Sequence, residues 1–106
     1  MTKSKSYDEY LLNLLINPQE ARDYLASALE DGDPKVIAIA LDYVVKARKI
    51  NKSQLARKTN INREHLYKIL SESSNPEFKT LQSILKAIGY QLTITECDRN
   101  SNNASH

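Results

Sequence analysis

Five polar side chains between positions 62 and 68 could form hydrogen bonds with the edges of nucleic-acid bases. Arg63 can donate two hydrogen bonds to O6 and N7 of guanine, and Glu64 can accept one from N4 of cytosine. Lys68 lies four residues after Glu64, which in a helix is the same face one turn further on. The predicted base-contacting set, with Arg63 ranked first, is Asn62, Arg63, Glu64, Tyr67 and Lys68. Tyr67 has a second interpretation, as a packed aromatic ring whose hydroxyl group reaches the surface.

Three residues further upstream could hold a phosphate group. Lys52, Ser53 and Gln54 open a predicted helix that runs to Thr59. Backbone N–H groups at the start of a helix lack partners within the helix, so they attract anions. Such phosphate contacts would position the protein on DNA without reading the base sequence.

Two short helices must position these side chains. The first is predicted from Lys52 to Thr59, and the second is predicted to begin after Asn62 as its N-cap. Ala56 is small enough for two helices to meet at a steep angle, Asn60 tolerates a left-handed turn, and Ile61 supplies an apolar plug. This spacing predicts a DNA-reading helix-turn-helix over residues 52–71. A helical hairpin with a purely structural purpose would show the same apolar spacing.

The charge distribution changes along the chain, although the net charge is only +2. Residues 7–33 carry seven acidic side chains and Arg22, whereas residues 46–70 carry eight basic side chains and Glu64. A basic second part fits a nucleic-acid partner, and the bland alternative is a solvated charged face.

Capping signals and apolar spacing predict four more helices. The first is predicted to begin at a capping box formed by Ser6 and Glu9, the second to run from Asn17-Pro18 to Gly32, and the third to begin at Asp33-Pro34. The fourth is predicted to contain Phe78 near its start and to end at Gly89. The helix after Pro34 is apolar nearly all round, so it is predicted to form core, with a partner contact as the alternative. The loop before Phe78 is predicted over residues 72–76.

The C-terminal part alternates apolar and polar side chains. Tyr90, Leu92 and Ile94 alternate with Gln91, Thr93 and Thr95, which is the pattern of a half-buried strand. The chain offers no second strand, so this one would pair with a second subunit or a partner protein. An extended tail lying on the helices is the other possibility. Residues 98–106 are polar and predicted to be disordered.

Several classes of function receive little support. The chain has two glycines, two histidines and one cysteine, Cys97, so it offers no glycine-rich phosphate loop and no metal-ligand cluster. Neither an enzyme nor a cofactor nor a metal site is therefore expected. No apolar run is long enough to span a membrane, and the first residues do not form a signal peptide. With 106 residues, we expect one domain in the cytoplasm.

The sequence resembles a known family of regulators. The matching segments are 54–59, 66–71, Asn75-Pro76, Thr80-Leu81, 84–89 and, upstream, the acidic stretch 29–34. These look like the Cro/C1-type (XRE-family) helix-turn-helix domain of addiction-module antidote proteins, similar to HigA-type antitoxins. The resemblance covers roughly residues 17–94. Family members usually have Gly where this chain has Asn60 and Ser74. This difference affects the expected geometry of the turns at these positions and not the expected fold.

The resemblance implies an all-α, lambda-repressor-like bundle of five to six short helices, with or without one short C-terminal strand. It also implies a division into an N-terminal arm (1–16), the helix-turn-helix domain (17–95) and a polar tail (96–106). The implied function is that of an antitoxin which neutralises a small RelE/ParE-like toxin and represses its own operon by binding double-stranded operator DNA as a homodimer. A plain transcriptional regulator without a toxin is the alternative, and a neutraliser that does not bind DNA is another.

Overall fold

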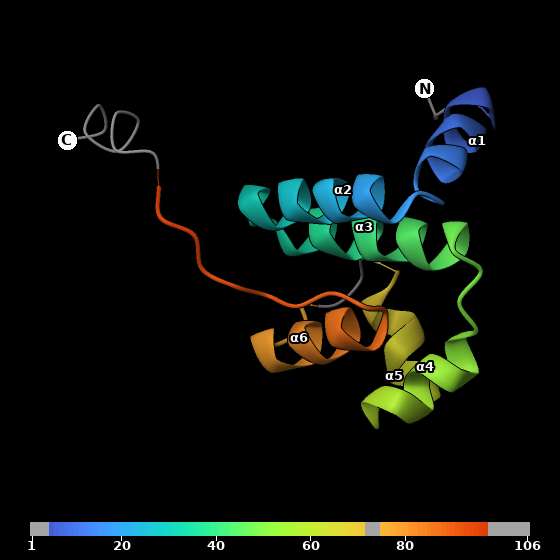
Figure 1. Ribbon diagram of the computed structural model, residues 1–106. Coiled ribbons are helices and arrows are strands. Elements are labelled where there is room, and N and C mark those ends of the chain that lie inside the picture. Colours follow the sequence, from blue (N-terminus) through green and yellow to red (C-terminus); the bar gives the residue numbers. More distant parts are fainter. Residues whose placement is uncertain (1–4, 72–74, 98–106) are drawn as a thin grey trace.

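The chain folds into six helices arranged in two groups (Figure 1). The computed structural model describes residues 5–71 and 75–97, and these ranges contain no strand. The first group consists of α1 (Lys5–Leu14), α2 (Pro18–Asp31) and α3 (Pro34–Ala47), with α3 packed against both α1 and α2. The second consists of α4 (Lys52–Thr59), α5 (Arg63–Ile69) and α6 (Phe78–Ala87), with α4 packed against both α5 and α6. The predicted all-α bundle is confirmed.

One cluster of buried hydrophobic side chains runs through both groups of helices. Its largest fully buried members are Leu15, Leu41, Val44, Val45, Leu55, Leu66, Ile69 and Ile84. Six residues of α3 belong to this cluster, as its apolar sequence predicts, although Val36 remains 37% exposed. Burial of this apolar surface is the main force that holds the two groups together.

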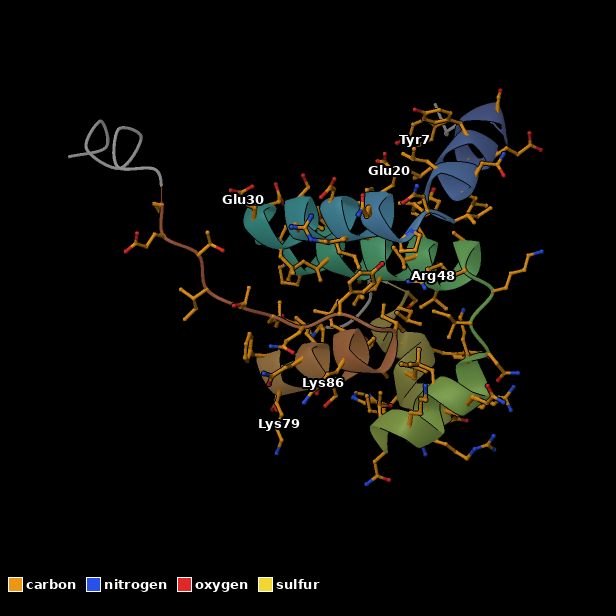
Figure 2. All side chains as sticks on the ribbon, in the orientation of Figure 1. Tyr7, Glu20, Glu30, Arg48, Lys79 and Lys86 are labelled. Carbon is orange, nitrogen blue, oxygen red and sulfur yellow. The ribbon has the colours of Figure 1, made fainter. Side chains whose placement is uncertain are left out.

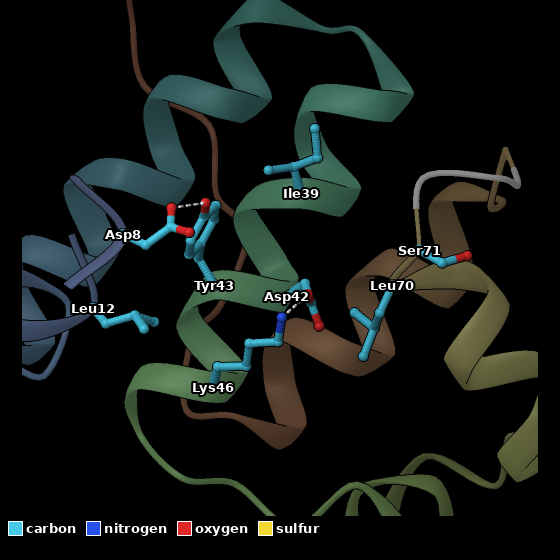
Figure 3. A pocket seen from close by; sticks show the side chains of 8 residues that line it. All are labelled: Asp8, Leu12, Ile39, Asp42, Tyr43, Lys46, Leu70 and Ser71. Atoms are coloured by element: carbon cyan, nitrogen blue, oxygen red, sulfur yellow. Dashed lines mark hydrogen bonds and ion pairs between the residues drawn. The ribbon is translucent and has the colours of Figure 1, made fainter. Parts of the chain in front are cut away.

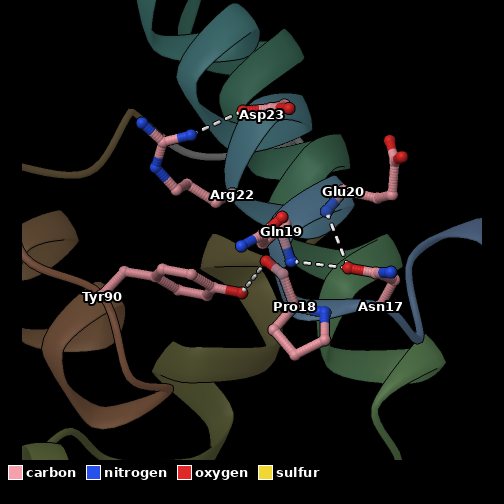
Figure 4. A network of polar contacts seen from close by, with 7 residues as sticks. All are labelled: Asn17, Pro18, Gln19, Glu20, Arg22, Asp23 and Tyr90. Carbon is pink, nitrogen blue, oxygen red and sulfur yellow. Dashed lines mark hydrogen bonds and ion pairs between the residues drawn. The ribbon is translucent and has the colours of Figure 1, made fainter.

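The helix boundaries follow from local capping. The side-chain oxygen of Asn17 accepts hydrogen bonds from the N–H groups of Gln19 and Glu20, at 2.8 and 3.3 Å (Figure 4). Asp33 caps α3 in the same way through the N–H of Lys35, at 3.0 Å. Gly32 ends α2 with a φ of 83°, a left-handed conformation that glycine adopts without steric cost. These predicted signals are confirmed.

Some predictions at the two ends of the fold are wrong. The first helix already includes Lys5, so Ser6 lies inside it and is not its N-cap. Helical spacing predicts Tyr10 and Phe78 in the apolar stripes of their helices, but Tyr10, in the middle of α1, is 63% exposed and Phe78, the first residue of α6, is 66% exposed. The predicted tail from residue 98 onward and residues 72–74 of the predicted loop lie outside the described residues.

The predicted C-terminal strand is not present as a strand. Residues 90–97 are extended, but within the described residues they pair with no other segment. They run alongside α2 and then leave the helices (Figure 1). A single extended segment cannot form a ladder of hydrogen bonds without a neighbour. Within the described part of the chain, no helix is both long and apolar enough to cross a membrane.

Candidate nucleic-acid interface

Helices α4 and α5 are joined by a tight turn that the sequence predicted. Asn60 has a φ of 61° and a ψ of 31°, the left-handed conformation expected at this position. The N–H of Ile61 donates to the carbonyl of Ala56 at 3.0 Å, which closes the end of α4. Asn62 then caps α5, because its side-chain oxygen accepts from the N–H groups of Glu64 (2.8 Å) and His65 (3.4 Å). The turn therefore fixes the direction in which α5 leaves α4.

Helix α5 has one buried face and one exposed face. Leu66 and Ile69 are fully buried, and Leu70 just after the helix is 4% exposed. The exposed set consists of the five predicted base-contacting residues and His65, that is Asn62, Arg63, Glu64, His65, Tyr67 and Lys68. The fold thus brings all five predicted side chains to one solvent-facing surface.

Tyr67 gathers two of the predicted cations around its ring. The guanidinium carbon of Arg63 lies 5.7 Å from the ring centroid, and the ammonium nitrogen of Lys52 lies 5.0 Å from it. A cation over an aromatic face is attracted by the ring's quadrupole, by about 0.5–1 kcal/mol at exposed sites. The ring is 44% exposed, so it is neither fully packed nor free. Its position holds the start of α5 next to the start of α4.

A hollow of about 350 Å³ lies between these helix starts and the end of α3. It is lined by Val45, Lys46, Lys49, Ile50, Asn51, Lys52, Ser53, Arg63 and Tyr67. Six of the nine are cationic or lie beside a helix N-terminus, which makes the hollow a place where a phosphate oxygen would be stabilised. We call it the basic hollow. Gln54 is exposed outside it, and its N–H is already taken by the side chain of Asn51 at 3.0 Å.

Asp42 orders two lysines at the edge of this hollow. One of its carboxylate oxygens lies 3.1 Å from the ammonium group of Lys46 (Figure 3), and the other lies 3.5 Å from that of Lys52. Sequence reasoning did not select Asp42, Lys46 or Lys49 as site residues. The spacing of Asp42 and Lys46, four residues apart in a helix, was a usable signal. The contact with Lys52 crosses the loop between α3 and α4 and leaves no such signal.

Acidic side chains gather on a different part of the surface. Glu20 and Glu30 point outward from α2, whereas Lys79 and Lys86 point away from α6 on the opposite side in Figure 2. Among the exposed side chains of Asp, Glu, Lys and Arg from Lys46 to Lys68, all except Glu64 are cationic. Opposite charges are therefore separated across the molecule, which favours two different partners.

Comparison with known proteins identifies the family of the chain. A family described as "Probable addiction module antidote protein" matches residues 7–96. The chain belongs to this family. An uncharacterized protein of Haemophilus influenzae (strain ATCC 51907 / DSM 11121 / KW20 / Rd) is 37% identical over 82 residues, which cover 77% of this chain and 82% of that protein. No solved structure matches significantly.

Membership in this antidote family indicates an antitoxin role and a toxin partner of some kind, in agreement with the broader part of the resemblance seen in the sequence. It also indicates a regulatory protein. The match does not distinguish XRE-family or HigA-type proteins from other antidotes.

Proposed function

We propose that this antidote protein is a type II antitoxin that represses its own operon as a homodimer and neutralises a small RelE/ParE-like toxin. The DNA-binding element would be α4 and α5, acting as a helix-turn-helix of the XRE type. The observation that carries this proposal is the gathering of Arg63, Tyr67 and Lys52 around the basic hollow.

In this proposal α5 enters the major groove with its N-terminal end toward the bases. Arg63 would then donate both of its terminal N–H groups to one guanine. Lys52 and Ser53, together with Lys46 at the edge of the hollow, would contact the phosphates that flank the groove. Glu64 and Lys68 would add contacts along the same exposed face.

A dimer is required on physical grounds, because one recognition helix reads only a few base pairs. Two such helices, spaced by about one turn of DNA or roughly 34–36 Å, double the length of sequence that is read. The operator is therefore expected to contain two related half-sites.

The test is binding of the purified protein to DNA from its own promoter, measured by fluorescence anisotropy at two salt concentrations. We expect Arg63→Ala to lose about 1–3 kcal/mol of binding free energy and to relax the preference for one base pair. The affinity of the wild-type protein should fall as salt rises, because phosphate contacts release counterions.

Lys35→Ala is the matched control. Lys35 is exposed in the first turn of α3, far along the chain from α4 and α5, and its loss also removes one positive charge. It should leave affinity nearly unchanged. If the wild-type protein does not prefer its promoter over random DNA, the DNA-binding half of the proposal is wrong, and neutralisation without DNA binding becomes the function to pursue.

The toxin half of the proposal is supported by the family and by the acidic outer face of α2, which would suit a basic, RNA-cleaving partner. Co-expression with the neighbouring gene separates the two remaining alternatives. Co-purification of a small basic protein supports an antitoxin. Specific DNA binding without any such partner supports a plain regulator.

A further inference from the structure

The extended segment after α6 is fixed at its start and open at its end. The N–H of Tyr90 donates to the carbonyl of Leu85 at 2.8 Å, and the half-buried Leu92 packs against the hydrophobic core. Ile94 is 95% exposed, more than any other large hydrophobic side chain in the described ranges. Between described residues, the backbone groups of residues 91–97 form no hydrogen bonds. A short run of β-branched residues thus presents unpaired backbone donors and acceptors, which is a template for pairing.

The sequence of this segment is self-complementary. If two copies pair antiparallel about Thr93, Leu92 of each copy lies opposite Ile94 of the other, and Gln91 lies opposite Thr95. One face of the pair is then apolar in both copies, and the other face is polar. Residues 91–95 contain no charged side chain, so this arrangement opposes no like charges.

A groove of about 680 Å³ beside the segment offers a place for the apolar face. Its apolar walls come from Leu25, Ala26 and Leu29 of α2, together with Leu85 and Leu92. Its polar lining comes from Arg22 and Glu30 of α2 and from Gln91, Thr93 and Thr95 of the segment itself. In the antiparallel register, Ile94 of the second copy would lie next to Leu92, where the groove is open. An isolated two-stranded ribbon is marginally stable in water, so this helical support matters.

We propose that two copies of this chain associate by pairing residues 91–95 as an antiparallel ribbon centred on Thr93, with each Ile94 covered by the groove of the other copy. A second copy is favoured over a toxin strand because the alternation of apolar and polar residues matches itself in this register. The ribbon would be the contact between the two subunits of the dimer in the proposed function. Its biological purpose rests on that proposed function, whereas the association itself does not.

Sedimentation equilibrium of the chain alone tests the association. We expect a dimer for the wild type and at least a roughly tenfold weaker dimer for Ile94→Lys, since each dimer would lose two apolar cross-strand contacts and bury two charges. The side chain of Ile94 is exposed in the single chain, so this variant should keep its helical content by circular dichroism. Gln91→Lys, which adds the same charge on the polar face, is the control and should associate like the wild type.

Disulfide crosslinking tests the register. In a Cys97→Ser background, Thr93→Cys places two thiols directly across the two-fold axis, within the Cβ separation that a disulfide allows. Thr95→Cys places them about 14 Å apart, and the native Cys97 would lie about 27 Å from its counterpart. We expect Thr93→Cys to crosslink at least about tenfold faster than Thr95→Cys or the wild-type protein.

Three results would overturn the inference: a wild-type chain that stays monomeric, an Ile94→Lys variant that dimerises like the wild type, or equal crosslinking at positions 93 and 95. A monomeric chain that pairs this segment only after toxin is added would identify the toxin as the occupant instead. Failure of this inference can be distinguished from failure of the proposed function. A wild-type chain that binds promoter DNA specifically but dimerises through another surface would refute the ribbon. It would leave the DNA-binding proposal intact.

Discussion

The helix that Asn62 caps limits which of its side-chain groups can form hydrogen bonds with DNA. Its oxygen accepts hydrogen bonds from the N–H groups of Glu64 and His65, so it is engaged before any ligand arrives. An asparagine that reads adenine uses both its oxygen and its amino group. In this structure, only the amino group of Asn62 is free to meet a DNA acceptor. The predicted base contact is therefore narrowed to donation of a hydrogen bond to a base or a phosphate.

Two substitutions separate the cap from the contact with DNA. Asn62→Ala should lower the free energy of unfolding by about 1 kcal/mol, because two N–H groups of α5 lose their acceptor. Asn62→Asp should keep the stability, since a carboxylate caps a helix equally well and interacts favourably with its N-terminus. The same Asp should weaken DNA binding, because it replaces a donor by a negative charge near phosphates. Urea unfolding and fluorescence anisotropy measure the two effects. Wild-type DNA affinity in Asn62→Asp would place position 62 away from the DNA.

At the scale of elements, α2 combines an apolar inner face with an acidic outer face. Ala21, Leu25 and Ala28 are buried, whereas Glu20 and Glu30 are exposed on the outer side (Figure 2). Asp23 lies on the same outer side as Glu20, three residues further along, and its ion pair with Arg22 at 2.7 Å is open to solvent (Figure 4). Exposed pairs of this kind stabilise a fold little, so the acidic face is free to serve a partner.

Charge reversal on α2 tests whether a basic toxin uses this face. The combined change of Glu20, Asp23 and Glu30 to Lys should weaken toxin binding by at least about tenfold, because three attractive contacts become repulsive. Isothermal titration calorimetry with the purified toxin measures the effect. Glu77→Lys with Glu96→Lys reverses two exposed acids that are not part of α2 and should leave the affinity nearly unchanged. Equal affinity of the triple variant and the wild type would exclude α2 as the toxin surface.

Among the elements, sequence reasoning succeeded where the decisive partners are close along the chain. The caps at Asn17, Asp33 and Asn62, and the left-handed turn at Asn60, each depend on residues within about four positions. The errors concern exposure and pairing, which depend on distant segments. Phe78 fits an apolar stripe by its spacing, but no other described segment covers the start of α6 closely enough to bury it.

The candidate site likewise contains one part that the sequence could predict and one part that it could not. The exposed face of α5 follows from helical periodicity, so its five polar residues could be selected from the sequence. The basic hollow needs the end of α3 to lie beside the start of α4, and nothing local encodes that placement. The contact between Asp42 and Lys52 therefore emerged only from the structure.

At the scale of the whole molecule, Tyr90 connects the two groups of helices. Its hydroxyl group donates to the carbonyl of Pro18 at 2.8 Å, at the start of α2 (Figure 4). It also accepts from the guanidinium of Arg48 at 3.0 Å, just after α3. Arg48 also lies 5.9 Å from the centroid of the ring. Since Tyr90 follows α6 directly, one phenol joins the second group to both large helices of the first.

This connection predicts that the two groups unfold together. Tyr90→Phe removes the hydroxyl group but keeps the ring, so it should lower the free energy of unfolding by about 1–3 kcal/mol, because two hydrogen bonds of about 0.5–1.5 kcal/mol each are lost, while urea unfolding stays a single transition. Tyr10→Phe is the control, because Tyr10 is 63% exposed and should lose almost nothing. An unchanged midpoint in Tyr90→Phe would mean that solvent replaces both hydrogen bonds at no cost. Two separate transitions in that variant would mean that the shared hydrophobic core alone does not couple the groups, and that Tyr90 holds the α4–α5 surface in place relative to α2 and α3.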